Sequence, residues 1–408
     1  MTIPFAAGPV VGGTPRPAMG SVREDLRAAL SRNLGSEVGK VKLPELLTFL
    51  REKQFIHPRW QSDAGYYHVP KGESGLGVTV DAFVDQEAHS VLALYVSRGG
   101  NRRQNLIGFG GEKLVYPGVS LVPDLGDIAV LKGIAPKDSH SVHQEVSFYR
   151  HFVGLPADAP PVNRGSYVSH HFRKVGGADT RRMKAFVPRS HGGDLIDWID
   201  RKGQAGGFKP ESLAGSHEAM VISSQIADHL AALHSKGIAH RDIKLDNCLD
   251  FGGWKLVDFG FWSYGEDRIM KGTPRYFCPF LFAKYLGGDK QCSLTDQMAG
   301  DVYAAGCLMR LLHRGKQGPV QLAVEKAVEG RSRPTVHTFE KAILRALESE
   351  RSSDVLPANA SPILREWVGL YQRMMDYQSS QRPDAATASQ QLKGLLARAS
   401  VELGLSPA

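Results

Sequence analysis

The sequence predicts an α+β protein in which strands come first and helices dominate the rest. Apolar and polar residues alternate within 77–98, in the runs VTVDAFV and SVLALYV, as is typical of two β-strands. Apolar residues recur at helical spacing within 226–233, and again around 319–329, 337–349 and 363–376. A chain of 408 residues that is 42% hydrophobic is too long for one ordinary core, so we expect two lobes and an extension.

The first 99 residues carry no motif of a known family. Residues 1–21 are rich in Gly and Pro and contain no acidic residue, a composition that predicts a disordered start. Two amphipathic helices are predicted from 22 to about 53, around DLRAAL and LPELLTFLREK. We therefore expect an α/β extension of unknown role at 22–99.

Composition and charge narrow the class of protein. The formal net charge is +8, but the Lys and Arg residues are dispersed and no nucleic-acid recognition motif accompanies them. No stretch is long and apolar enough to cross a bilayer, and the N-terminus lacks the apolar region of a secretory signal. The four cysteines show no metal-binding CxxC spacing, so we expect reduced thiols and a cytoplasmic location. The pattern does not indicate an oligomeric state.

The most informative motif is the run HRDIKLDN at 240–247, which is followed by DFG at 258–260. A helical pattern ends at Gly237 just before it, and residues 255–257 predict a short strand that leads into the DFG turn. Each short motif alone is common in polar loops and turns. Joined at this spacing, the two resemble the catalytic loop and metal-binding turn of eukaryotic-type serine/threonine protein kinases.

This resemblance implies chemical roles for four residues. Asp242 would orient an attacking hydroxyl and accept its proton, and Lys244 would neutralise the transferred phosphoryl group. Asn247 and Asp258 would bind magnesium through oxygen atoms, the ligands that this ion prefers. The implied cofactors are therefore ATP and Mg²⁺.

Two upstream segments resemble the lysine and the glutamate that position the nucleotide phosphates in kinases. In DIAVLK at 127–132, Lys132 would reach the phosphates and Ala129 would contact adenine. Glu145 lies in a predicted helix whose apolar stripe consists of Val142, Val146, Tyr149 and Phe152. On the resemblance this is helix αC, and Glu145 forms an ion pair with Lys132. A solvated strand lysine and a surface glutamate are the alternatives.

A glycine-rich segment precedes this strand. In GFGGEKLV at 108–115, Gly108, Gly110 and Gly111 follow the spacing of a phosphate-binding loop, and glycine amides can approach phosphate closely. Lys113 stands where the kinase pattern has its last glycine, so it either contacts phosphate or points to water. Val115 would cover adenine together with Ala129. A plain hairpin turn is the alternative.

The segment MKAFVPRSHGGDLIDWID at 183–200 resembles the hinge between the two kinase lobes. The implied nucleotide contacts are Val187 behind adenine, the backbone of 188–190 with Arg189, Asp194 near the ribose, and Leu249 below adenine. Pro188 has no amide proton, so any hinge donor must come from a neighbour.

Downstream residues bear on the acceptor and on activation. GTPRY at 272–276 resembles the segment on which kinases seat a peptide, and its Thr273 favours serine or threonine as acceptor. Arg241 is of the kind that pairs with a phosphate on the activation loop. The candidate partners of this arginine are phosphorylated Ser263 or Tyr264, or the standing charges of Glu266 and Asp267.

One family landmark is missing. Where the pattern has Ala-Pro-Glu, the sequence has Cys-Pro-Phe at 278–280, so the glutamate that pairs with a buried arginine is absent. Arg382 is the matching arginine and must find another partner or face water, because an unpaired buried charge costs roughly several kcal/mol. Asp301 resembles the aspartate that holds the catalytic-loop backbone, and we expect it also to cap the start of its helix.

The resemblance covers about residues 100–400 and implies a bilobal protein-kinase-like fold. We expect an N-lobe at 100–187, with a small antiparallel β-sheet and helix αC, and a mostly helical C-lobe at 188–408. The implied activity is transfer of the ATP γ-phosphoryl group to a serine or threonine of a protein substrate. Asp194 and Asp246 favour basic residues before the acceptor.

Two other functions stay open. A small-molecule kinase of the aminoglycoside or choline type shares the chemistry of the lower lobe, and a pseudokinase that acts as a binding module is suggested by Lys113 and Phe280. A flexible start ahead of a kinase-like domain is also similar to bacterial effector kinases delivered into host cells. The intact set of catalytic residues favours the protein kinase.

Overall fold

The computed structural model describes much of the chain between residues 66 and 405. The described residues are 66–69, 79–85, 90–97, 108–109, 113–120, 128–133, 144–145, 148, 169–175, 178–188, 190, 192–205, 207–330 and 333–405. The chain divides into a sheet unit, 1–108 with 115–130, and a helical unit, 109–114 with 131–408. The predicted disordered start and the helices predicted within 22–53 lie outside the described residues.

Strands of the sheet unit hydrogen-bond side by side. They are β1 (Tyr66–Val69), β2 (Thr79–Asp85), β3 (Ser90–Ser97), β5 (Lys113–Ser120) and β6 (Ile128–Gly133), in that order across the sheet. Strand β3 is antiparallel to both β2 and β5, with Phe83 opposite Ala93 and Leu94 opposite Val119. The two strands predicted within 77–98 are thus confirmed, and β3 joins them to β5.

The helical unit also contains β-strands and a short helical segment around Glu145. Strands β7 (Ser169–Val175) and β8 (Ala178–Pro188) form an antiparallel hairpin. Strand β4 (Gly108–Phe109) pairs with β5. The division between the units falls within both strands, so that Phe109 of β4 and the first two residues of β5 belong to the helical unit. Gln144, Glu145 and Phe148 have helical backbone, in agreement with the helix predicted around Glu145.

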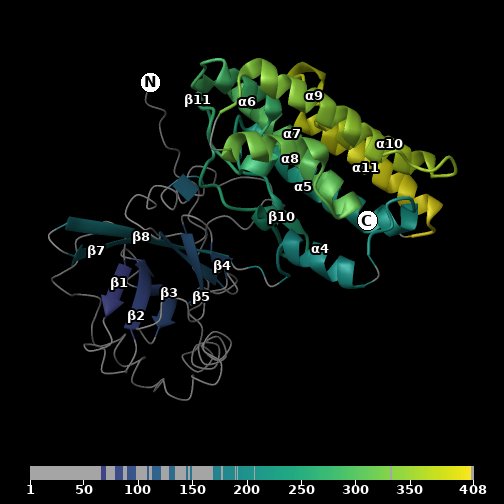
Figure 1. Ribbon diagram of the computed structural model, residues 1–408. Helices are drawn as coiled ribbons and strands as arrows, with labels where there is room; N and C mark the ends of the chain where they lie inside the picture. The colour runs from purple at the N-terminus through teal and green to yellow at the C-terminus, as the bar shows by residue number, and fades with distance from the viewer. Residues whose placement is uncertain are drawn as a thin grey trace. The chain divides into compact units, whose positions relative to one another are not determined.

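Most of the helical unit is a bundle of helices (Figure 1). They are α4 (Leu195–Gln204), α5 (Leu213–Ser235), α6 (Pro279–Leu286), α7 (Leu294–Arg314), α8 (Pro319–Glu329), α9 (Val336–Ser353), α10 (Pro362–Met374) and α11 (Ala385–Glu402). The helices predicted at 319–329, 337–349 and 363–376 are therefore confirmed as α8, α9 and α10. None of the helices in the described part is long and apolar enough to span a membrane.

Helix α5 lies at the centre of this bundle because it contacts α7, α10 and α11. Its residues Ile226, Leu230 and Leu233, which recur at helical spacing, are all buried. Burial of such a stripe removes apolar surface from water and is the main favourable term in folding. The helix ends one turn before the catalytic loop, so its packing fixes where that loop begins.

Two short antiparallel strand pairs lie at and before the activation segment. Strand β9 (Cys248–Asp250) pairs with β10 (Trp254–Leu256), and β11 (Asp267–Arg268) pairs with β12 (Gln291–Cys292). The first confirms the small strand predicted before the DFG turn. All four cysteines are free and buried.

Gly315 ends helix α7 in the left-handed conformation, with φ of 70°. A Cβ at this position would lie 2.4 Å from the ring of Phe208. We predict that Gly315→Ala lowers the free energy of unfolding by more than ~1 kcal/mol, because left-handed strain and a clash add together. A urea titration followed by circular dichroism would measure the loss.

Gly394 is the matched control for this substitution. It lies at an exposed position of helix α11, where an added Cβ meets no atom within 4 Å. Gly394→Ala should stabilise the protein by up to about 1 kcal/mol, because alanine favours helix over glycine. Equal effects of the two substitutions would contradict this account of Gly315.

Candidate active site

The carboxylate of Asp301 holds the backbone at the start of the catalytic loop. Its Oδ2 accepts the backbone N–H of His240 at 2.7 Å, and its Oδ1 accepts that of Arg241 at 2.7 Å. The His234 ring contacts the same carboxylate at 3.1 Å. Arg241 has φ of 71°, a strained conformation for a residue with a side chain, and these hydrogen bonds hold it there.

The expected role of Asp301 in holding the loop is therefore confirmed, but the expected helix cap is wrong. Asp301 lies well inside α7, which is capped by Ser293 through its hydroxyl and the N–H of Asp296. The physical reason is that α7 starts earlier than the apolar pattern suggested. Ser293 directly precedes its first residue, and serine is a strong N-cap.

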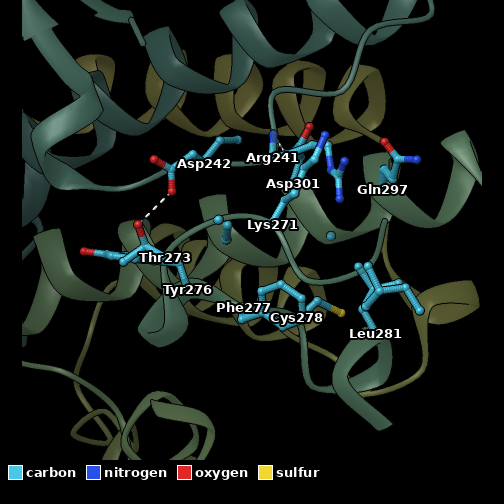
Figure 2. Close-up of a pocket in the computed structure, with 15 residues that line it drawn as sticks. Arg241, Asp242, Lys271, Thr273, Tyr276, Phe277, Cys278, Leu281, Gln297 and Asp301 are labelled. Atoms are coloured by element: carbon cyan, nitrogen blue, oxygen red, sulfur yellow. Dashed lines mark hydrogen bonds between the residues drawn. The ribbon is translucent and has the colours of Figure 1, made fainter. Parts of the chain in front are cut away.

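Asp242, the candidate catalytic base, is 5% exposed. Its Oδ2 lies 3.0 Å from Lys244 Nζ and accepts a hydrogen bond from Asn247 Nδ2 at 3.1 Å. Its Oδ1 accepts the hydroxyl of Thr273 at 2.7 Å, as Figure 2 shows. Burial lowers the pKa of Lys244, but the Asp242 carboxylate more than offsets this and the pKa lies above its ordinary value.

Asp258 is brought beside this loop by the β9–β10 hairpin. The N–H of Val257 donates to the backbone oxygen of Asn247 at 2.9 Å, so the two candidate metal ligands come from neighbouring chain segments. Asp258 has φ of 65°. Burial raises the pKa of its carboxyl, but the Lys113 ammonium, with a smaller effect of Lys244, holds it below its ordinary value.

Lys113 forms the ion pair that the sequence assigned to Lys132. Its Nζ lies 2.6 Å from Glu145 Oε2 and also contacts Asp258 Oδ1. Lys113 is 8% exposed and Glu145 is 3% exposed, so the expectation that Lys113 could point to water is wrong. Burial lowers the pKa of Lys113, but the two carboxylates raise it well above its usual range and keep the ammonium charged.

The physical reason for this correction lies in the direction of a strand side chain. Lys113 opens β5, and its side chain enters the buried space beside Glu145. Sequence spacing gives no information on which of two strand lysines faces a helix. Lys132 lies in β6, and its side chain is outside the described part of the structure.

Two aromatic residues that the sequence reading missed join the DFG turn to the helix of Glu145. Phe148 is fully buried, and its ring stacks on Phe259 with centroids 3.6 Å apart and planes 8° apart. Trp262 donates its ring N–H to the carbonyl of Gln144 at 2.8 Å. The predicted apolar stripe of this helix did not include Phe148, and a tryptophan just after DFG was the available signal.

The activation segment is anchored by a carboxylate of its own. Arg241 Nη1 lies 2.6 Å from Asp267 Oδ2, and Lys271 Nζ lies 2.5 Å from the same oxygen. Partial burial raises the pKa of Asp267. Its hydrogen bonds with Lys271 and Arg268 and the charge of Arg241 lower the pKa by more, so it lies below its ordinary value. Of the two acidic residues expected to pair with Arg241 without phosphorylation, Asp267 makes the contact. Glu266 is exposed.

Gln297 fixes the start of the same segment. Its side-chain amide donates to the carbonyls of Gly265 at 2.9 Å and Cys292 at 3.0 Å. Ser263 exchanges two backbone hydrogen bonds with Ala239, and its hydroxyl donates to Gln297. Ser263 is therefore buried and unavailable as a phosphosite in this arrangement, whereas Tyr264 is 73% exposed.

Arg382 finds partners without the missing glutamate. Its guanidinium donates to the carbonyls of Asp376 at 2.7 Å, Ala299 at 2.7 Å and Tyr377 at 3.1 Å. It also lies over the ring of Tyr303, 5.2 Å from the centroid. Backbone carbonyls and an aromatic face therefore replace the carboxylate in satisfying this buried cation.

The expected ribose and adenine-floor residues lie together. Asp194 caps α4 by accepting the N–H of Asp197 at 2.9 Å, and it forms an antiparallel bridge with Leu249. Gly193 has φ of 83°, and its carbonyl accepts the N–H of Asp250 at 3.1 Å. The capping role of Asp194 was not predicted, although Asp before a helical pattern is a recognised signal.

The remaining expected nucleotide residues are only partly described. Ala129 is buried and Val115 is half-buried in the sheet unit, and Gly108 and Val187 lie in strands β4 and β8. Gly110, Gly111 and Arg189 lie outside the described residues.

A cavity of about 40 Å³ lies below the catalytic loop (Figure 2). Arg241, Asp242 and Asp301 line one side, and Thr273 and Cys278 are among the residues that line the rest. This volume suits about one water molecule and is far too small for a nucleotide. Asp194 and Leu249, where nucleotide contacts are expected, are not among the residues that line it.

The helical bundle, the loop of Asp242 and the turn of Asp258 together define the class of protein as a eukaryotic-type kinase lobe. A sequence model of the family described as "Protein kinase domain" matches residues 180–392, more than half of the chain. The chain belongs to this family.

Several curated protein kinases are similar to parts of the chain. CBL-interacting protein kinase 25 of Oryza sativa subsp. japonica is 32% identical over 151 residues, 34% of this chain and 27% of that protein. 3-phosphoinositide-dependent protein kinase 1 of Arabidopsis thaliana is 26% identical over 217 residues, 51% of this chain and 38% of that protein. Human testis-specific serine/threonine-protein kinase 4 is 37% identical over 103 residues, 24% of this chain and 28% of that protein. The matches thus span less than two fifths of these relatives.

We predict that Arg382→Met lowers the free energy of unfolding by ~3 kcal/mol, because three carbonyls lose a charged donor in a site that is 8% exposed. Phe280→Glu should not stabilise the protein, since the guanidinium is already satisfied. Chemical denaturation of both variants measures these effects. Arg398→Met, at a side chain that is 51% exposed, is the control and should change little. Clear stabilisation by Phe280→Glu would contradict this account.

Proposed function

We propose that this protein is a serine/threonine protein kinase that transfers the γ-phosphoryl group of ATP to a protein hydroxyl. The observation that carries the proposal is the 2.7 Å hydrogen bond from the Thr273 hydroxyl to Asp242 Oδ1. It shows a hydroxyl donating to the carboxylate that would have to accept a substrate proton. The curated relatives named above are all protein kinases, and one is a serine/threonine kinase by name, which supports this acceptor class.

In the proposed reaction, the substrate hydroxyl takes the place of Thr273 at Asp242. Its oxygen forms a bond to the γ-phosphorus, the bond from that phosphorus to the β–γ bridging oxygen breaks, and ADP leaves. The hydroxyl proton passes to Asp242 Oδ1. Lys244, 3.0 Å from the other oxygen of Asp242, would stabilise the negative charge of the transferred group.

Asn247 and Asp258 fit a magnesium ion in their chemistry. The amide nitrogen of Asn247 donates to Asp242, which leaves the amide oxygen as the atom that can bind a ligand. Lys113 and Gly260 both contact Oδ1 of Asp258, which leaves Oδ2. Two such oxygens, completed by phosphate oxygens and water, suit this ion. When bound, Mg²⁺ would supply positive charge against the phosphates.

The nucleotide contacts inferred from the sequence are part of the same proposal. They are Gly108, Gly110, Gly111, Val115, Ala129, Glu145, Val187, Arg189, Asp194 and Leu249. The bridge between Asp194 and Leu249 supports neighbouring roles at the ribose and below adenine. Lys132 was assigned to the phosphates by the same resemblance, but the ion pair of Lys113 argues for a different assignment, which is developed below.

We also propose a preference for basic residues near the acceptor. Burial is the first cause that raises the pKa of Asp194, and the nearby charges of Asp197 and Asp246 add to it. Asp194 and Asp197 exchange hydrogen bonds between backbone and carboxylate, and the charge of Asp246 acts on the same site. A peptide that carries Arg or Lys would relieve their mutual repulsion.

The other candidate functions are less well supported. A small-molecule kinase would have no use for the Thr273 segment that is bound to Asp242, and a pseudokinase would not need Asp242, Asn247 and Asp258 in place. A role as an effector delivered into a host cell rests only on the composition of the first residues. Fractionation of infected host cells would test it.

We predict that Asp242→Asn reduces phosphoryl transfer by about 10³-fold or more, because the amide cannot accept the hydroxyl proton. The measurement is transfer of label from [γ-³²P]ATP to a mixture of proteins and metabolites, with the acceptor residue identified by mass spectrometry. Asp289→Asn, at an exposed position, is the control for loss of one negative charge. We expect label on protein serine or threonine with wild type and the control.

Other outcomes of this assay separate the rivals. Label that is found only on a metabolite would support a small-molecule kinase. Nucleotide binding without transfer by wild type would support a binding module. Label on tyrosine alone would contradict the proposed acceptor class.

We predict that the kinase is active without phosphate on its activation segment, because Asp267 already pairs with Arg241. Wild type treated with phosphatase, and shown by mass spectrometry to be unmodified between 261 and 276, should keep its activity. Asp267→Asn should lower activity about tenfold, the equivalent of ~1.4 kcal/mol. Asp267→Glu should retain part of it, and exposed Glu266→Gln serves as the neighbouring control. Loss of activity on phosphatase treatment would show that phosphate is required.

A further inference from the structure

We propose that Lys113, and not Lys132, is the lysine that binds the phosphates of the nucleotide. The proposal rests on the proposed kinase function, because it assigns a role within that site. It starts from the contacts of Lys113 Nζ with Glu145 Oε2, at 2.6 Å, and with Asp258 Oδ1. The lysine stands where the kinase pattern has a glycine.

The position of the ammonium follows from that of Asp258. Asp258 is the carboxylate proposed to hold magnesium, and magnesium in such sites lies on the nucleotide phosphates. A cation that hydrogen-bonds this carboxylate is therefore within reach of the same phosphates. Lys113 meets this requirement directly.

The donor count of Lys113 leaves room for a phosphate oxygen. A lysine ammonium has three N–H donors. Glu145 and Asp258 use two of them, and no third partner of Lys113 is present within the described part of the chain.

Glu145 is held in place by contacts other than the ion pair itself. Trp262 donates to the carbonyl of Gln144 at 2.8 Å, and Phe148 stacks on Phe259 at 3.6 Å. These contacts hold residues before and after Glu145 in the sequence against Phe259 and Trp262, which follow Asp258. Glu145 can then orient Lys113 whether or not a nucleotide is bound.

A rival interpretation gives Lys113 the opposite effect. An ammonium on Asp258 could compete with magnesium and hold the site closed. The two interpretations differ in sign, because removal of the ammonium weakens nucleotide binding in the first and strengthens it in the second.

The most direct test uses the unaltered full-length protein with an acyl phosphate of ATP. In this reagent the amine of a nearby lysine attacks the acyl carbonyl, forms an amide and releases ATP. Peptide mass spectrometry then identifies the lysine. We expect acylation chiefly at Lys113, suppressed by excess ATP. Acylation chiefly at Lys132 would overturn the proposal, and so would acylation that excess ATP does not suppress.

Substitutions give an independent measurement. Lys113→Met should raise the Kd for MgATP, or lower kcat/KM, by about 100-fold, because a buried charge pair loses its cation. Lys132→Met should lose less than a tenth as much, and Lys113→Arg should recover part of the loss. Lys393→Met, at a side chain that is 61% exposed, is the control for loss of a surface charge. Thermal melting of each variant shows whether it is folded.

The outcomes separate this proposal from the proposed function. Tighter MgATP binding by Lys113→Met would support the competing role and overturn the proposal. A larger loss in Lys132→Met than in Lys113→Met would also overturn it. If wild type transfers no phosphate but binds MgATP through Lys113, the kinase function fails while the assignment of Lys113 stands.

Discussion

The arrangement of the site depends on the carboxylate of Asp301. It lies inside a buried helix, and it accepts the N–H groups of two successive residues, His240 and Arg241. Arg241 would otherwise not keep a left-handed backbone, and this bend turns Arg241 toward the activation segment while Asp242 faces Thr273. The Asp301 carboxylate thus orients the side chains of both Arg241 and Asp242, which contact different partners.

The activation segment is held from several independent directions. Asp267 binds Arg241 and Lys271, Gln297 binds the backbone at Gly265, and Thr273 binds Asp242. Each contact satisfies a polar group that is at least partly buried, so release of any one of them leaves a costly unpaired partner. The segment is therefore held by the chain's own charges, and this is the physical basis for proposing that it needs no phosphate.

The motifs of the helical unit were predictable from the sequence because the chemistry restricts them to few residue types at fixed spacing. Asp242, Lys244, Asn247 and Thr273 are brought together as expected. The ion pair of Lys113 with Glu145 was not predictable, because sequence spacing does not show toward which residue a strand side chain points. The partners of Arg382 were not predictable either, because every residue has a backbone carbonyl and the sequence does not show which ones accept a hydrogen bond.

Both departures from the family pattern therefore have a physical explanation in the contacts that the structure shows. The lysine that replaces a glycine at 113 forms a buried ion pair with Glu145 and contacts Asp258, the candidate metal ligand, and the phenylalanine at 280 leaves Arg382 satisfied by carbonyls. A protein without catalytic function has no reason to keep this ammonium between two carboxylates, because burying the charges of Lys113 and Glu145 costs more than burying apolar side chains of the same size. That cost, retained at the centre of the site, favours a catalytic protein over a binding module.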